Sequence, residues 1–178
     1  MFFERHTDLE TAFPEVFRQM TSRSYQDEKA QRLEVVEHRC DITDAGSGRI
    51  TVVSRRTSPA GSVPELIRAM VKPTLTVTET ESWHAPDGGP GRQGDFSVQV
   101  SGAPIAVKGT VHLDPAGTGC RLTFEGELRT TVPLFRSAIE SAASGRVIDT
   151  IEAEFALLQD IFRPGAATDG AARRSVDQ

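Results

Sequence analysis

Cysteine is scarce in this sequence, which has only Cys40 and Cys120 among its 178 residues. The two are isolated, and neither belongs to a CxxC pair or to a zinc-type spacing. We therefore expect no zinc site and no redox motif. In a reducing compartment both thiols are expected to be buried and to behave as small apolar side chains.

Long hydrophobic runs are absent. No stretch reaches the roughly eighteen consecutive apolar residues that a membrane-spanning helix needs. The first residues, MFFERHTDLE, turn charged at once and lack the apolar core of a signal peptide. We therefore expect a cytoplasmic protein with no integral membrane segment.

An excess of positive charge is absent as well. The formal net charge is −5 and the basic residues are scattered along the chain, which argues against a nucleic-acid partner. The hydrophobic fraction of 38% and the charged fraction of 25% are typical of a soluble globular protein. A chain of this length suits one domain with a substantial core. The composition indicates no particular oligomeric state.

The spacing of apolar residues predicts a long helix over residues 132–162. Apolar side chains recur there at steps of three and four, as on one face of a helix: Phe135, Ile139, Ala142, Ile148, Ile151, Phe155, Leu158 and Phe162. Thr131 can cap the start, and Pro164 ends the run. Residues 137–145 are mostly small and the second half is bulky, so this helix is expected to seal a core at one end and leave room at the other. Gly145 is either a tolerated helix glycine or a kink.

Two capping-box patterns predict further helices. The first, Thr7 to Glu10, predicts a helix that follows a short strand over residues 2–6. The polar stretch 21–31 predicts a second short helix or a loop. The second capping box, Ser62 to Glu65, predicts a short helix that Pro73 ends.

From residue 33 onward the apolar period changes to two, which predicts strands. Residues 33–42 and 49–57 form a predicted hairpin, and further strands are predicted at 74–84, 95–100, 105–113 and 121–131. The links between them are rich in glycine and proline. Residues 164–178 have almost no large apolar side chain and are predicted to be a disordered tail.

This order of elements resembles the START-like, or birch-pollen-allergen-like, helix-grip superfamily (SRPBCC). The stretches VPELIRAMVKPTLTVTETESW and VPLFRSAIESAASGRVIDTIEAEFALL are similar to a bacterial branch known as a domain of unknown function. The resemblance covers about residues 1–163. It implies an α+β helix-grip domain, in which a curved seven-stranded antiparallel sheet wraps around the last helix and encloses an apolar cavity.

The function that the resemblance implies is binding of a hydrophobic small molecule. Members of the superfamily bind or carry lipids, sterols and polyketides, and some are aromatase/cyclases. They share no catalytic motif, so the resemblance assigns no catalytic residue and no cofactor.

His38 and Cys40 are two residues apart, so on a strand their side chains share one face with Val36 and Ile42. A Cys–His pair can serve nucleophilic catalysis, but no third group that would orient the histidine is identified. His38 is therefore interpreted as a core or cavity-wall residue, with ligand contact as the alternative. The other histidines show no metal-binding spacing, so no metal site is predicted.

Glu79 and Glu81 interrupt the apolar face formed by Leu75, Val77 and Trp83. If the strand keeps its register, both carboxylates lie near the cavity, where burial would raise their pKa values and allow acid–base chemistry. The simpler interpretation is that a bulge or the strand end places both in water.

The candidate cavity-lining residues are His38, Cys40, Val52, Met70, Leu75, Val77, Trp83, Phe96, Val98, Val107, Phe124, Phe135 and Ile139. Three functions follow in order of preference. The first is a non-enzymatic binder or carrier of a lipid, sterol-like molecule or polyketide. The second is a cyclase/dehydratase-type enzyme that moves protons with His38, Glu79 or Glu81. The third is a protein-interaction module whose core is filled by side chains.

Overall fold

The computed structural model describes residues 1–33, 35–59, 73–84, 87–133 and 136–163. Its elements follow one another as β1 (Phe2–Leu9), α1 (Phe13–Met20), α2 (Arg23–Arg32), β2 (Glu37–Asp44), β3 (Ile50–Pro59), β4 (Thr74–Trp83), β5 (Arg92–Ser101), β6 (Ile105–Ala116), β7 (Gly119–Thr130) and α4 (Arg136–Ile161). The helix predicted from residue 62 and the tail predicted from residue 164 lie outside the described residues.

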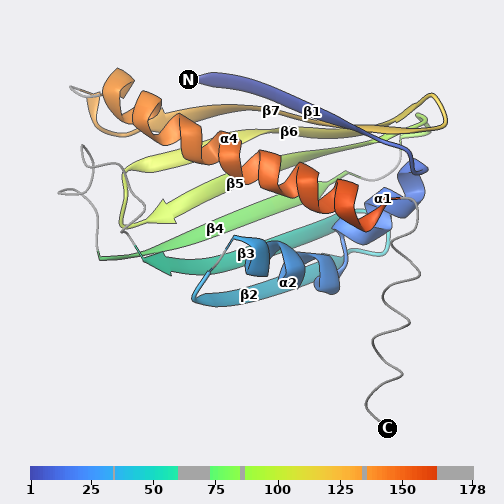
Figure 1. Ribbon diagram of the computed structural model, residues 1–178, viewed down its shortest axis with the longest axis horizontal. Coiled ribbons are helices and arrows are strands. Elements are labelled where there is room, and N and C mark those ends of the chain that lie inside the picture. The colour runs from blue at the N-terminus through green and yellow to red at the C-terminus, as the bar shows by residue number, and fades with distance from the viewer. Residues whose placement is uncertain (34, 60–72, 85–86, 134–135, 164–178) are drawn as a thin grey trace, which may run out of the picture.

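The seven strands form one antiparallel sheet in the order β1-β7-β6-β5-β4-β3-β2. Strands β2 to β7 each pair with their neighbours in sequence, whereas β1 joins β7 at the opposite edge from β2. The sheet curves, α4 crosses its concave face, and α1 and α2 lie beside the C-terminal end of α4 (Figure 1). The predicted helix-grip architecture is confirmed.

Strand β7 illustrates how residue alternation produces the two faces of this sheet. Leu122, Phe124 and Leu128 are buried, while Arg121 and Glu125 are exposed to solvent. Successive side chains of a strand point to opposite faces, so one face of the sheet is apolar and contacts the helices. The predicted period of two is therefore the cause of the covered face.

Helix α4 supplies the other half of the core. Its buried residues recur at helical spacing and include Ile139, Ala143, Ile151, Phe155 and Leu158. The rings of Phe155 and Phe124 lie 6.0 Å apart between centroids, which joins the helix to β7. The helix continues through Gly145, as a tolerated glycine would allow. No helix in the described part of the chain is long and apolar enough to cross a membrane.

The first predicted helix start is wrong. Residues 7–9 belong to β1, where Thr7 pairs with Leu122 and Leu9 with Cys120, and α1 begins only at Phe13. The ladder with β7 supplies hydrogen bonds to this backbone and buries Leu9, which outweighs a local capping preference. Helix α1 then starts after Ala12, with proline in its first turn.

Two paired glycines allow two aromatic rings to approach the backbone of the sheet closely. Gly109 of β6 pairs with Gly126 of β7, and the neighbouring strands place Phe96 opposite Gly109 and Phe3 opposite Gly126. A Cβ atom on Gly126 would lie 2.6 Å from Cζ of Phe3 and 3.0 Å from Cζ of Phe96. Because glycine lacks this atom, both rings can occupy the floor of the concave face.

Candidate functional site

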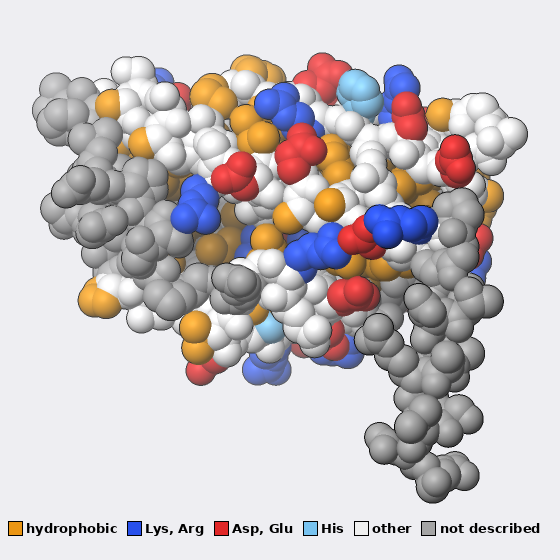
Figure 2. All heavy atoms as spheres, viewed as in Figure 1, with side chains coloured by type: hydrophobic (Ala, Val, Ile, Leu, Met, Phe, Trp, Pro, Cys, Tyr) orange, Lys and Arg blue, Asp and Glu red, His pale blue; other side chains and the backbone are white. Residues whose placement is uncertain are grey.

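A cavity of about 290 Å³ lies between the concave face of the sheet and α4. Most of its wall is aliphatic or aromatic and consists of Leu33, Val35, Leu75, Val77, Phe96, Val98, Val100, Ala103, Ile105, Val107, Phe124, Ala143, Val147 and Ile151. The polar side chains of the wall are Arg56, Glu79, Arg146, Thr150 and Glu154. The volume is near the lower end of the range for small-molecule sites, about 300–1,000 Å³. On the face shown in Figure 2, a hollow with apolar atoms on its floor is visible beside α4.

The cavity faces the middle of α4, from Ala143 to Glu154. Ala143 and Val147 lie in the wall, whereas Phe155 and Leu158, further along the helix, are packed in the hydrophobic core. The predicted room beside residues 137–145 is therefore found only at Ala143, and the wall continues into the second half of the helix.

Six of the residues predicted from the sequence lie in the cavity wall: Leu75, Val77, Phe96, Val98, Val107 and Phe124. Cys40, Val52, Trp83 and Ile139 are buried elsewhere in the domain and do not line the cavity. The ring of Trp83 instead packs edge-on against Phe17 of α1, with centroids 5.2 Å apart. Met70 and Phe135 lie outside the described residues.

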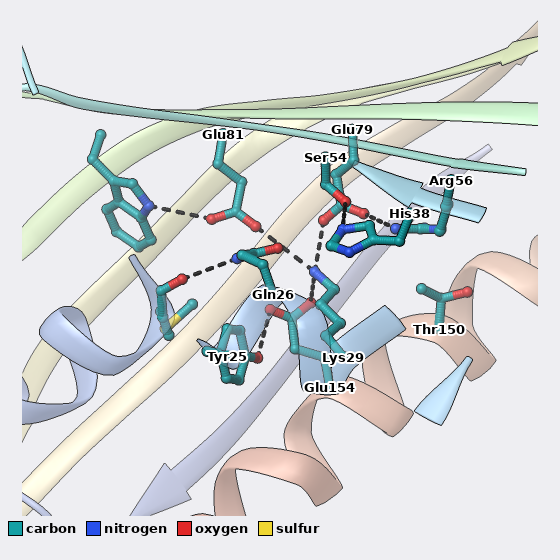
Figure 3. Close-up of polar contacts among 12 residues, drawn as sticks. Tyr25, Gln26, Lys29, His38, Ser54, Arg56, Glu79, Glu81, Thr150 and Glu154 are labelled. Carbon is teal, nitrogen blue, oxygen red and sulfur yellow. Dashed lines mark hydrogen bonds and ion pairs between the residues drawn. The ribbon is translucent and has the colours of Figure 1, made fainter. Parts of the chain in front are cut away.

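A buried network of charged side chains, centred on Lys29 of α2, forms the polar side of the cavity (Figure 3). The ammonium nitrogen of Lys29 lies 2.7 Å from Oε1 of Glu79, 2.7 Å from Oε2 of Glu154 and 3.9 Å from Oε1 of Glu81. Nη1 of Arg56 donates to Oε2 of Glu79 at 2.7 Å. We call this set, with the two aromatic residues described next, the Lys29 network.

Two aromatic side chains complete the hydrogen bonding of the Lys29 network. The hydroxyl of Tyr25 donates to Oε1 of Glu154 at 3.0 Å, and the indole nitrogen of Trp83 donates to Oε2 of Glu81 at 3.2 Å. Both oxygens of Glu79 and both oxygens of Glu154 therefore have a partner within the protein. Buried charges require such partners, because an uncompensated charge in a protein interior costs several kcal/mol.

The pKa values of Glu79 and Glu81, the two carboxyls on β4, are shifted in opposite directions by their neighbours and by burial. Burial alone would raise the pKa of Glu79, but Lys29 and Arg56 hold it well below its usual range. Burial raises the pKa of Glu81 to about 8 against the opposing charge of Lys29, and Glu154 and Glu79 add to the rise. Burial would lower the pKa of Lys29, but the three carboxyls keep it above its usual range. The two cations thus favour the ionised form of Glu79, whereas burial favours the neutral form of Glu81.

The interpretation that Glu79 and Glu81 face water is wrong. Their exposed fractions are 8% and 2%. Strand β4 keeps its ladder with β3 and β5 as far as Trp83, so the alternation continues and both side chains share the covered face. The expected rise of the pKa occurs for Glu81 and not for Glu79, because Glu79 lies between two cations.

No local pattern in the sequence marks the remaining site residues, which are Tyr25, Lys29, Arg56 and Glu154. Weak signals were present: Lys29 lies one helical turn after Tyr25, and Glu154 lies on the apolar stripe between Ile151 and Leu158. A charged residue on a buried stripe indicates a buried partner, but the pattern does not say which one.

Oxygen atoms of Glu79, Glu81 and Glu154 lie within 4.8 Å of one another, a spacing that could hold a metal ion. The Lys29 ammonium lies among them and contacts all three. The positive charge that three carboxyls require is therefore supplied by the chain itself, and the donor set fits an ion-pair network better than a metal site.

His38 lies between Ser54 and Asp27, outside the cavity wall. Its Nε2 is 3.1 Å from Oγ of Ser54, and its Nδ1 is 3.2 Å from Oδ1 of Asp27 on α2. This order of groups is the one that serine hydrolases use, and no local pattern in the sequence marks Asp27 as the orienting group. Ser54 is only 5% exposed, and none of the three residues lines the cavity. The contacts of His38 therefore join α2 to the hairpin formed by β2 and β3.

Three solved structures show what this chain resembles. The protein TTHA0849 from Thermus thermophilus matches with a TM-score of 0.61 at 14% identity, over 90% of this chain and 95% of that one. Ara h 8.0201 matches with a TM-score of 0.55 at 14% identity, over 90% and 98% of the two chains. Norcoclaurine synthase from Thalictrum flavum, solved with dopamine and hydroxybenzaldehyde, matches with a TM-score of 0.53 at 12% identity, over 90% and 87%.

At these identities the likeness shows the fold alone, which is that of the START-like, or birch-pollen-allergen-like, helix-grip superfamily. No curated protein matches the sequence. Residues 6–161 match the family described as "Protein of unknown function (DUF2505)", and the chain therefore belongs to that family.

Proposed function

We propose that this protein binds a hydrophobic small molecule in the cavity between the sheet and α4. The observation that carries the proposal is the composition of the wall, in which aliphatic and aromatic side chains of β4 to β7 face those of α4 across about 290 Å³. Apolar surface left facing such a space favours a ligand that displaces water from it.

The contacts of the polar wall residues support binding more than catalysis. A general base needs an accessible oxygen and a pKa near the working pH. Both oxygens of Glu79 are held by cations, and the same cations depress its pKa. Glu81, whose pKa is near neutral, does not line the cavity, and neither does His38. A cyclase/dehydratase-type enzyme is therefore the second candidate, and an interaction module with a filled core is the third.

The test is saturable binding of a hydrophobic fluorophore, compared with a variant in which the cavity is filled. Val147 is half-buried and lines the cavity on α4, so Val147→Trp should lower the affinity at least tenfold. Ser141, exposed on the same helix and outside the wall, provides the matched control Ser141→Trp, which should bind like the wild type.

Native mass spectrometry of protein purified without detergent would complement this measurement. A stoichiometric adduct that is lost on denaturation is the expected result. Absence of fluorophore binding by the folded wild type, or equal binding by Val147→Trp, would contradict the proposal.

A further inference from the structure

Strand β2 is an open edge of the sheet. It pairs with β3 on one side, and no strand in the described part of the chain pairs with its other side (Figure 1). Its eight residues, EHRCDITD, include neither proline nor lysine, which natural proteins often place on exposed edges to prevent strand addition. An open strand of this length is a template for pairing with another chain.

Every second residue of β2 directs its backbone groups to the open side. Across the hairpin, the amide of Ala45 donates to the carbonyl of Arg49 at 3.0 Å, so these two residues form a hydrogen-bonded pair. Hydrogen-bonded and non-hydrogen-bonded pairs alternate along an antiparallel ladder, and the latter point their amides and carbonyls away from the partner strand. Counting back from Ala45 through the register of β2 and β3, the outward residues are His38, Cys40, Ile42 and Asp44.

The solvent-facing side chains of β2 carry charges of alternating sign. Glu37, Arg39 and Asp41 are all exposed there. Arg39 lies directly opposite Arg55 of β3, which is exposed as well, and like charges in this arrangement destabilise a sheet. Among the described residues, the one ion pair of these two arginines joins Nε of Arg39 to Asp41 at 3.8 Å. A further carboxylate opposite Arg39 would therefore stabilise this edge.

We propose that a second copy of this chain supplies that carboxylate, and that two copies pair antiparallel through β2 about a two-fold axis at Cys40. Arg39 of each copy then lies opposite Asp41 of the other, and Glu37 lies opposite the neutral Thr43. A two-fold contact of this kind closes on itself and joins two sheets into one.

Backbone and charge together select this register. A shift by one residue would place outward backbone groups against inward ones, so that the ladder could not form. A shift by two residues would bring Asp41 against Asp41 of the second copy, or Arg39 against Arg39, depending on its direction. Only the register centred on Cys40 pairs the outward groups and also sets opposite charges face to face.

Arg23 of α2 occupies part of the same edge in the single chain. Its Nη2 atom donates to the carbonyl oxygen of Cys40, which in the dimer would accept from the amide of Cys40 in the second copy. Arg23 is exposed, so its guanidinium returns to water when it leaves the edge. Arg23 thus competes with dimer formation and lowers its strength.

Sedimentation equilibrium of the full chain at increasing concentration tests the pairing. The average mass of the wild type should rise from that of one chain towards that of two. Asp41→Arg should raise the dissociation constant at least tenfold, because it sets two arginines opposite each other. The double change Arg39→Asp with Asp41→Arg restores opposite charges and should restore the dimer.

Two further variants separate the edge contact from general effects of charge. Asp114 is exposed on β6, away from β2 in the order of the strands, so Asp114→Arg makes the same change in net charge and should leave the dissociation constant unchanged. Arg23→Ala removes the competing donor and should lower the dissociation constant several-fold.

Hydrogen exchange identifies the surface involved. On dimer formation, the amides of His38, Cys40 and Ile42 should gain protection, whereas those of Arg39 and Asp41, which already face β3, should change little. A wild type that stays monomeric up to its highest soluble concentration would overturn the proposal. A dimer that Asp41→Arg leaves intact would also overturn it. Masses that grow beyond two copies would do the same, because they indicate head-to-tail pairing of β2 with β1.

Discussion

The ammonium nitrogen of Lys29 lies 2.7 Å from Oε2 of Glu154, and both side chains are buried. This contact joins α2, near the start of the chain, to α4 at its end. Lys29 also holds Glu79 on β4, so one side chain connects two helices and the sheet beside the cavity. The stability of the domain and the electrostatics of its cavity are therefore linked through the same residue.

Removal of the Lys29 charge should be costly. Lys29→Met leaves the buried carboxylates without their shared cation, and breaking a buried pair typically lowers the free energy of unfolding by about 3–5 kcal/mol. Urea denaturation at neutral pH measures the loss.

Arg32 provides a matched control on the same helix, because it pairs with Asp160 of α4 at 2.6 Å with both side chains more than a third exposed. Solvent screens such a pair, so Arg32→Met should cost less than about 1 kcal/mol. Similar losses in the two variants would contradict a special role of the buried network.

The protonation of Glu81 should make stability depend on pH. Its pKa rises from 4.5 to about 8 on folding, so the folded protein favours the neutral form. Stability associated with Glu81 is complete below about pH 4.5 and is lost progressively as the pH rises through 8. Glu81→Gln, which remains neutral, should therefore change the melting temperature little at pH 4 and raise it most at pH 9. At pH 9 the free energy of unfolding should rise by up to about a few kcal/mol.

Thermal unfolding of wild type and Glu81→Gln at several pH values checks this prediction. Glu125 is exposed on β7, and Glu125→Gln serves as the control without a pH-dependent gain. A stabilisation by Glu81→Gln that is the same at pH 4 and pH 9 would show that its carboxyl is not protonated in the folded state.

Two glycines should respond to alanine in opposite directions. Gly126→Ala places a methyl group against the rings of Phe3 and Phe96 on the sheet and should destabilise the domain by about 1–3 kcal/mol. Gly145→Ala meets open space on α4 and should stabilise the helix by up to about 1 kcal/mol. Chemical denaturation of both variants measures the difference, and destabilisation by Gly145→Ala would mean that a specific backbone shape is required there.

Ser54 should be structural and not nucleophilic. Ser54→Ala removes the hydrogen bond with His38 and should cost about 1 kcal/mol without changing fluorophore affinity. Because Ser54 is buried, a fluorophosphonate should leave the intact mass of the folded protein unchanged. An adduct that disappears in Ser54→Ala would instead indicate a reactive hydroxyl and favour the enzymatic alternative.

Much of the fold could be predicted from local patterns. The alternation in residues 74–83 and 119–130 and the three-and-four spacing in α4 are properties of short segments, and each predicts which face is covered. The capping box at Thr7 failed, because pairing with β7 is a contact between distant segments that no local pattern contains.

The apolar part of the candidate site was also visible in these patterns, since Leu75, Val77, Phe96, Val98, Val107 and Phe124 follow from strand alternation and lie in the wall. Their role in ligand binding stays a prediction. The polar part was not visible. A lone glutamate on an apolar face is interpreted as solvated unless a cation is known to lie beside it.

Residue order along the chain thus determined the strands, the long helix and the apolar face that they share, because periodicity acts over a few residues. Assembly of the domain decided the burial and protonation of Glu79 and Glu81. Lys29 and Glu154 come from opposite ends of the sequence, and Arg56 from another strand. Electrostatic energy depends on distance in space and on exclusion of water, and both are set only when the helices close over the sheet.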